Sequence, residues 1–113
     1  MKPGGGRAKG HAFERLVANL FKAAGWTNAK RGLGQARHAE VPDVQGVPPW
    51  WPELKRMRKC DIPAALAQAL RDCTRDPSTP YTIPVAITKD DNGPIVVSMF
   101  WDDWLKMVKL LQS

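Results

Sequence analysis

Residues 46–49, Gly-Val-Pro-Pro, interrupt the middle of the chain, because this run of glycine and prolines breaks regular secondary structure. Two strand-like runs, residues 41–45 and 50–57, lie on either side of the break. A bend between such runs predicts a hairpin, and a hairpin centred on Pro48 places Asp43 opposite Glu53. Their Cβ atoms would then be roughly 5 Å apart. The break therefore predicts that two carboxylates meet on one face of a small sheet.

The residues after Glu53 suggest what such a pair of acids can do. Side chains alternate between the two faces of a strand, so Glu53 and Lys55 point the same way and Leu54 points to the opposite face. Two close carboxylates repel unless a cation lies between them or one binds a proton. Mg²⁺ is bound by one or two carboxylates with water and phosphate oxygens. The pattern indicates metal-assisted phosphodiester hydrolysis, and its alternative is a charged hairpin without chemistry.

The hairpin carries one irregularity. Pro52 has no N–H to donate to a ladder, so its strand is predicted to be an edge strand or to be bulged there. The predicted pairing also depends on register, since a slip of one residue would put Asp43 and Glu53 on opposite faces.

Composition narrows the possible partners and compartments. The 113 residues suit one domain, and 17 Lys and Arg against 11 Asp and Glu give a net charge of +6. This charge favours a polyanion such as nucleic acid, although a basic protein without a specific anionic partner has the same balance. Cys60 and Cys73 are too few for a disulfide framework. With no secretion signal and no apolar run of about 20 residues, we expect a soluble, cytoplasmic protein without a membrane partner.

Hydrophobic periodicity places the remaining elements. We expect a flexible basic arm at residues 1–8, and then one domain at residues 9–113. The domain should contain three helices, at 9–24, from 61–63 onward and at 101–111. A short strand and a basic loop are expected within 26–40, and a hairpin is expected to turn at Asn92-Gly93. The fold class is a small α/β domain, with a central mixed sheet flanked by helices in the order α-β-β-β-α-β-β-α.

Five short motifs, taken in this order, resemble those of a known family. They are "GHAFE" (residues 10–14), "RGLGQARHAEVPD" (31–43), "PELKR" (52–56), "AALAQAL" (64–70) and "TKDDNGPIVVSMFWDDWLKM" (88–107). Together they resemble the PD-(D/E)xK nuclease superfamily, and within it the archaeal-type Holliday junction resolvases and their small phage-encoded relatives. The chain departs from the family pattern at Trp50-Trp51-Pro52, and it has no obvious serine before Asp43 for a phosphate contact.

The resemblance implies a restriction-endonuclease-like fold and specific roles. Asp43 and Glu53 would bind Mg²⁺, for which Mn²⁺ substitutes, together with the carbonyl of Leu54. Lys55 would be the catalytic lysine, and Glu14 would complete the site as a ligand or by holding a water. Gln68 would contact a water or a phosphate, or else be a partly buried structural residue. The implied activity is the resolution of four-way DNA junctions by a homodimer, in a bacterial host cell if the chain is phage-encoded, without a small-molecule cofactor.

Basic and aromatic residues complete the expected DNA surface. The candidates for phosphate contacts are Arg7, Lys9, Lys30, Arg31, Arg37, Arg56, Arg58 and Lys59. Trp50 and Trp51 are candidates for a dimer contact or a wedge at the branch point, whereas Trp101 and Trp104 are expected in the core or at a subunit contact. Two other functions remain open: a nickase or end-processing nuclease on other DNA structures, and a non-catalytic nucleic-acid-binding module.

Overall fold

A computed structural model describes residues 5–32, 41–75 and 82–112 of the chain. Its elements are α1 (Gly5–Ala23), β1 (Lys30–Arg31), β2 (Val44–Gln45), β3 (Trp50–Met57), α2 (Ile62–Arg75), β4 (Ile83–Asp90), β5 (Ile95–Met99) and α3 (Trp101–Gln112). The expected element order is confirmed, and the molecule is a small α/β domain with helices on both faces of a mixed sheet. No helix among the described residues is both long and apolar enough to cross a membrane.

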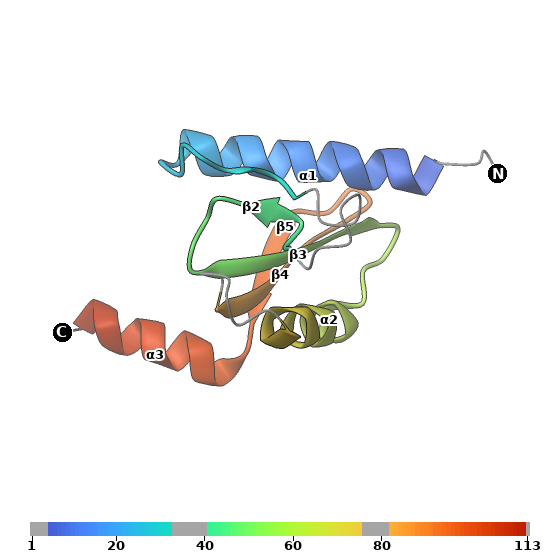
Figure 1. Cartoon of the computed structure of the whole chain (residues 1–113). Helices are drawn as coiled ribbons and strands as arrows, with labels where there is room; N and C mark the ends of the chain where they lie inside the picture. Colours follow the sequence, from blue (N-terminus) through green and yellow to red (C-terminus); the bar gives the residue numbers. More distant parts are fainter. Residues whose placement is uncertain (1–4, 33–40, 76–81, 113) are drawn as a thin grey trace.

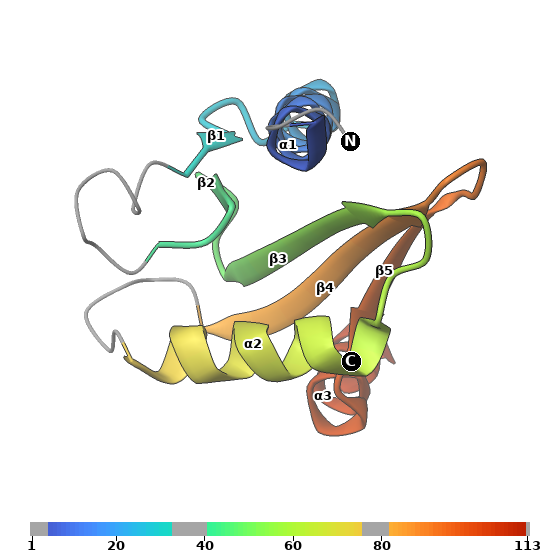
Figure 2. The same cartoon turned by 90° about the vertical axis from the view of Figure 1, so that its right-hand side faces the viewer.

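The main sheet has three strands in the order β3-β4-β5. β3 and β4 run parallel, with Glu53 beside Ala86, and β5 returns antiparallel to β4, with Ile87 beside Val97. Helix α1 lies across one face of this sheet and α2 lies across the other, while α3 extends away from the body after β5 (Figures 1 and 2). The sheet is therefore a central layer with β3 and β5 at its two edges.

The expected hairpin between residues 41–45 and 50–57 is not formed as a ladder, and this prediction was wrong. β2 pairs instead with β1 in a separate two-stranded antiparallel sheet, in which Arg31 faces Val44. β3 takes β4 as its ladder partner, because the longer β-branched strand after α2 offers eight paired positions. Asp43 still reaches β3 through one backbone bond, from its N–H to the Pro52 carbonyl at 3.1 Å.

The ends of the first two helices follow from local sequence. α1 begins at Gly5, four residues before the expected start, so the expected basic arm overlaps the helix. Gly25, at a φ of 121°, follows its end, and the bonds from Gly25 N to Lys22 O and from Trp26 N to Phe21 O form a Schellman motif. Asp61 caps α2, within the expected start at residues 61–63, by accepting a hydrogen bond from the Ala64 N–H at 3.0 Å.

The core is divided by the two faces of the sheet. On the α1 face, Phe13 and Val17 pack with Leu54, Val85 and Ile87. On the α2 face, Trp51 packs with Ala69 and Cys73, and only 1% of Trp51 is exposed. The prediction that Trp51 forms a wedge or a dimer contact was therefore wrong, and Trp50 also packs against the core. Since alternate residues of β3 share a face, Glu53 and Lys55 lie on the face that α2 covers.

Candidate active site

Asp43 approaches β3 from the side that β4 does not occupy. Its carboxylate oxygen Oδ2 accepts a hydrogen bond from the Leu54 N–H at 2.8 Å. The N–H and the C=O of a strand residue project to the same side, so the Leu54 carbonyl points toward this same edge. Pro52 occupies an edge strand, as predicted, and its lack of an N–H costs no ladder bond here, because only its carbonyl is used, by the Asp43 N–H.

Two close backbone approaches fix the segment that carries Asp43. Gly32 donates its N–H to the Asp43 carbonyl at 2.8 Å, and a Cβ on Gly32 would lie 1.9 Å from the Pro42 carbonyl oxygen. A Cβ on Gly46 would lie 2.1 Å from the Asn28 carbonyl oxygen, and Gly46 has a φ of 83°. Because no larger residue fits at either position without moving backbone, the glycines hold Asp43 against the edge of β3.

Glu53 and Lys55 form the second part of the site. The Lys55 Nζ lies 3.4 Å from the Glu53 Oε2. Only 5% of Glu53 is exposed, whereas the Lys55 side chain is 35% exposed and reaches solvent. The strand therefore presents a buried acid with an ammonium beside it, as the alternation of side chains predicts.

The two acids share an electrostatic environment that raises both pKa values. Burial raises the pKa of Asp43 to about 6, against the opposing effect of the Leu54 N–H, and the charge of Glu14 raises it further. Burial also raises the pKa of Glu53 to about 7; the charge of Asp43 contributes to this rise and Lys55 opposes it. The charge of Asp43 acts on Glu53, although the backbones of the two residues are not ladder partners. Such a pair gains by binding a cation.

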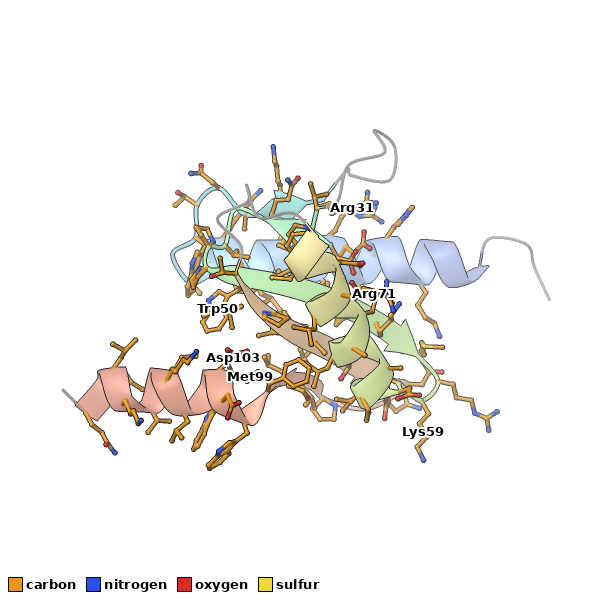
Figure 3. The ribbon with its side chains drawn as sticks, turned by 60° about the horizontal axis from the view of Figure 1, so that its bottom comes forward. Arg31, Trp50, Lys59, Arg71, Met99 and Asp103 are labelled. Carbon is orange, nitrogen blue, oxygen red and sulfur yellow. The ribbon has the colours of Figure 1, made fainter. Side chains whose placement is uncertain are left out.

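Glu14 approaches the same site from α1. Its Oε1 accepts a hydrogen bond from the Arg31 Nε at 3.1 Å, and Figure 3 shows Arg31 beside that helix. The Glu14 side chain is 19% exposed, and its negative charge acts on Asp43. The structure thus brings Glu14, Asp43, Glu53 and Lys55 together, although the arginine holds the Glu14 carboxylate.

One acid near the site was not expected from the sequence. Asp72 of α2 contributes negative charge that raises the pKa values of both Asp43 and Glu53. Its side chain is 18% exposed, and it lies one helical turn after Gln68, which is half-buried. The spacing of four residues from Gln68, on the same helix face, was the available signal.

The donor set fits a hard divalent cation. Among the residues that the structure describes, no three His, Cys, Asp or Glu side chains are gathered closely enough to hold a metal ion by themselves. Mg²⁺, however, needs only one or two carboxylates when waters and substrate oxygens complete its shell. Asp43 and Glu53, with the Leu54 carbonyl at the same edge, supply such a set.

The candidate DNA-contacting residues fall into two groups. Lys9 and Arg56 both form ion pairs with Asp91 in the turn between β4 and β5, and Arg31 is paired with Glu14. Lys30, Arg58 and Lys59 are exposed, and Lys59 projects outward near the start of α2 (Figure 3). The side chain of Arg7 and the whole of Arg37 lie outside the described part of the chain.

Comparisons of the chain with models of protein families, with curated proteins and with solved structures found no match. Inference about function therefore rests on the chemistry of the site, on the charge of the chain and on the motif resemblance.

Proposed function

We propose that the protein is a Mg²⁺-dependent, structure-selective DNA endonuclease with a restriction-endonuclease-like fold, which resolves four-way junctions as a homodimer. The observation that carries the proposal is the pair of acids at the edge of β3, with Asp43 hydrogen-bonded to the Leu54 N–H and Glu53 beside Lys55. The order of the short motifs along the chain, from the "GHAFE" segment to the last helix, supports the same family of nucleases.

The residues that would hold the cation are Asp43, Glu53 and the carbonyl of Leu54, with Glu14 at the flank. A divalent ion supplies two effects there: it lowers the pKa of a coordinated water, and it neutralises charge that develops on the phosphate. The cation requires ionised ligands. Because burial raises the pKa of Glu53 to about 7, activity should increase as the pH rises through neutrality.

The other groups of the site act by position and charge. Lys55 keeps its ammonium at the solvent side of Glu53, where it donates hydrogen bonds to a phosphate oxygen or to the attacking water. The Leu54 N–H fixes the orientation of the Asp43 carboxylate. Gln68, which is half-buried on the helix that covers this face of β3, would bind a water or a phosphate oxygen.

The basic surface supplies binding to DNA that does not depend on base sequence. A net charge of +6 favours a polyanion, and the exposed Lys30, Arg58 and Lys59 are the described candidates for phosphate contacts. Each contact releases counterions, so affinity for a junction should decrease linearly with the logarithm of salt concentration.

The test is incubation of the protein with a synthetic four-way junction in Mg²⁺ or in EDTA. Wild type should produce paired, symmetric nicks in Mg²⁺ and none in EDTA. Glu53→Gln and Lys55→Ala should each reduce the rate by about 10²-fold or more while binding the junction with little change in affinity. Lys106→Ala, on the outer helix α3, is a matched control for the loss of a lysine and should cleave as wild type does.

The products distinguish the alternatives. Cleavage of flaps or linear duplex in preference to the junction would identify a nickase or an end-processing nuclease with the same chemistry. Binding without cleavage in Mg²⁺ or Mn²⁺ would contradict the proposal and identify a non-catalytic nucleic-acid-binding module.

A further inference from the structure

Asp91, in the turn between β4 and β5, binds two cationic side chains that come from distant elements. Its Oδ1 accepts a hydrogen bond from the Lys9 Nζ of α1 at 3.1 Å and another from the Arg56 Nη1 of β3. The hydrogen bonds from Arg56 and Lys9 lower the pKa of Asp91, so its carboxylate is ionised at neutral pH. Two cations therefore converge on a single anionic oxygen.

The backbone around this cluster is fixed independently of the ion pairs. The Asp91 N–H donates to the Met57 carbonyl at 3.0 Å, and the Gly93 N–H donates to the Asp90 carbonyl at 2.9 Å. Asp90, in contrast to Asp91, uses its carboxylate to bind backbone, by accepting a hydrogen bond from the Cys60 N–H at 2.7 Å. The Asp91 carboxylate can therefore leave its two partners while the turn stays against the end of β3.

The ion pairs themselves are open to solvent. The side chains of Lys9 and Asp91 are 42% and 38% exposed, and that of Arg56 is 20% exposed. Ion pairs exposed to this degree contribute little to stability, because water and salt screen the charges and the long side chains lose entropy. Holding the turn in place is therefore a weak explanation for three converging charges.

The charge of the cluster and of its surroundings favours an anion. Lys9, Arg56 and Asp91 have a net charge of +1, because two cations share one carboxylate. The exposed Arg58 and Lys59 follow β3 directly, and the charge of Lys59 acts on the end of β4. Arginine and lysine side chains that converge on one oxygen bind phosphate in the same way. A phosphodiester has one negative charge, as a carboxylate does, so exchanging one for the other keeps the charge balance.

The cluster lies near the acid site on the same strand. Arg56 is three residues after Glu53, so their Cα atoms are about 10 Å apart along β3. This distance equals the rise of about three nucleotides in one strand of a duplex. Arg56 projects from the face opposite to Glu53, toward the turn that extends beyond the end of β3 (Figure 2). A duplex with one phosphate at the acid site therefore has further phosphates within reach of the cluster.

We propose that Lys9 and Arg56 form a subsite for a backbone phosphate of DNA, and that the carboxylate of Asp91 occupies this subsite until DNA displaces it. The inference rests on the proposed function for the identity of the polyanion, and it adds a place outside the acid site where that polyanion is held. Asp91 thereby lowers the affinity for DNA in general. It favours DNA that presents one phosphate to the subsite while another lies at the acid site.

The first test is fluorescence anisotropy of the full chain with a labelled four-way junction in EDTA, so that binding is measured without cleavage. Asp91→Asn should tighten binding at least about 3-fold, because no carboxylate then competes for the subsite, and Lys9→Gln should weaken binding about 3-fold. The matched controls are Asp102→Asn on α3 and Lys22→Gln at the end of α1, both at exposed positions, which should each change the affinity by less than about 1.5-fold. Circular dichroism should show all four variants folded. Equal effects of Asp91→Asn and Asp102→Asn, or of Lys9→Gln and Lys22→Gln, would overturn the proposal.

A neutral phosphate in the DNA locates the contact and separates this proposal from the nuclease activity. Junctions with a single methylphosphonate, moved along one strand, should bind wild type more weakly at one position, and the loss at that position should be smaller for Lys9→Gln. The absence of any position whose loss depends on Lys9 would overturn the subsite, even in a protein that cleaves junctions. The same dependence on Lys9 in a protein that does not cleave DNA would support the subsite and contradict only the nuclease activity. A wild type that does not bind the junction would overturn both.

Discussion

The two edges of the main sheet are opposite in chemistry. At the β3 edge the chain buries charge: Glu53 is 5% exposed, and Asp43 uses its carboxylate to satisfy the Leu54 N–H. At the β5 edge the chain exposes apolar side chains, with Val97 at 62% and no residue of α3 fully buried. Both arrangements decrease the stability of an isolated chain, since buried acids and exposed apolar groups are each unfavourable. We infer that the β3 edge is completed from outside the chain, by a cation and DNA.

The tryptophans at the two edges should differ most in their effect on stability. Trp51→Ala removes a side chain that packs with Ala69 and Cys73, so it should lower the free energy of unfolding by about 3–5 kcal/mol. Trp101→Ala removes a side chain that is 65% exposed, so it should change the free energy of unfolding by less than about 0.5 kcal/mol. Urea unfolding of both variants measures the two changes in the free energy of unfolding. Equal decreases would contradict the difference in packing between the two edges.

The pH dependence of stability isolates the buried acid at the β3 edge. Folding raises the pKa of Glu53 from 4.5 to about 7, so the folded chain binds a proton more tightly than the unfolded chain does. This contribution is fully present below the unfolded pKa and is lost as the pH rises through about 7. Between pH 4 and pH 8 in EDTA, wild type should lose about 3 kcal/mol more than Glu53→Gln loses.

The control for this experiment is Mg²⁺, which should reduce the loss in wild type and leave Glu53→Gln unchanged. If the free energy of unfolding of the two proteins in EDTA depends on pH in the same way, the pKa of Glu53 is not raised by folding. That result would contradict the description of Glu53 as a buried acid with a raised pKa.

The smallest predicted effect concerns Asp72, whose charge reaches the β3 site from α2. Asp72→Asn should lower the pKa of Glu53, but by less than Asp43→Asn does, because Asp43 is the stronger influence. NMR titration of the Glu53 carboxyl carbon measures both changes. Asp103→Asn, in the first turn of α3, is a matched control that should leave Glu53 unaltered. An unchanged pKa in Asp72→Asn would place Asp72 outside the site.

The sequence predicted local structure well because local signals determine it. The end of the first helix near residue 24, the start of the second at 61–63 and the turn at Asn92-Gly93 each depend on a few neighbouring residues, and all three were confirmed. The pairing of β3 with β4 was not predicted, because it joins strands separated by a helix and competes with a nearer partner. The sequence left Trp101 and Trp104 of α3 between the core and a subunit contact, since an apolar stripe has the same pattern in both cases, and their exposure rules out the core.

The sequence named the residues that the structure brings together at the edge of β3, but not how they meet. The spacing of Glu53 and Lys55 is sufficient to place them on one face of a strand. Asp43 reaches the same place through a side-chain bond to a backbone N–H at the strand edge, which no alternation pattern describes. Asp72 was missed because the sequence does not show which side of α2 meets the sheet. Without that information, an acid on this helix that faces the site cannot be told from one that faces solvent.

The most direct test of the central claim is carboxyl-carbon NMR titration of Asp43 and Glu53 in wild type, with and without Mg²⁺. Without the metal, we predict apparent pKa values of about 6 for Asp43 and about 7 for Glu53. With saturating Mg²⁺, both values should decrease, because the cation favours the ionised carboxylates. Titration of both groups near their ordinary values, or pKa values that Mg²⁺ leaves unchanged, would contradict a cation site at the edge of β3.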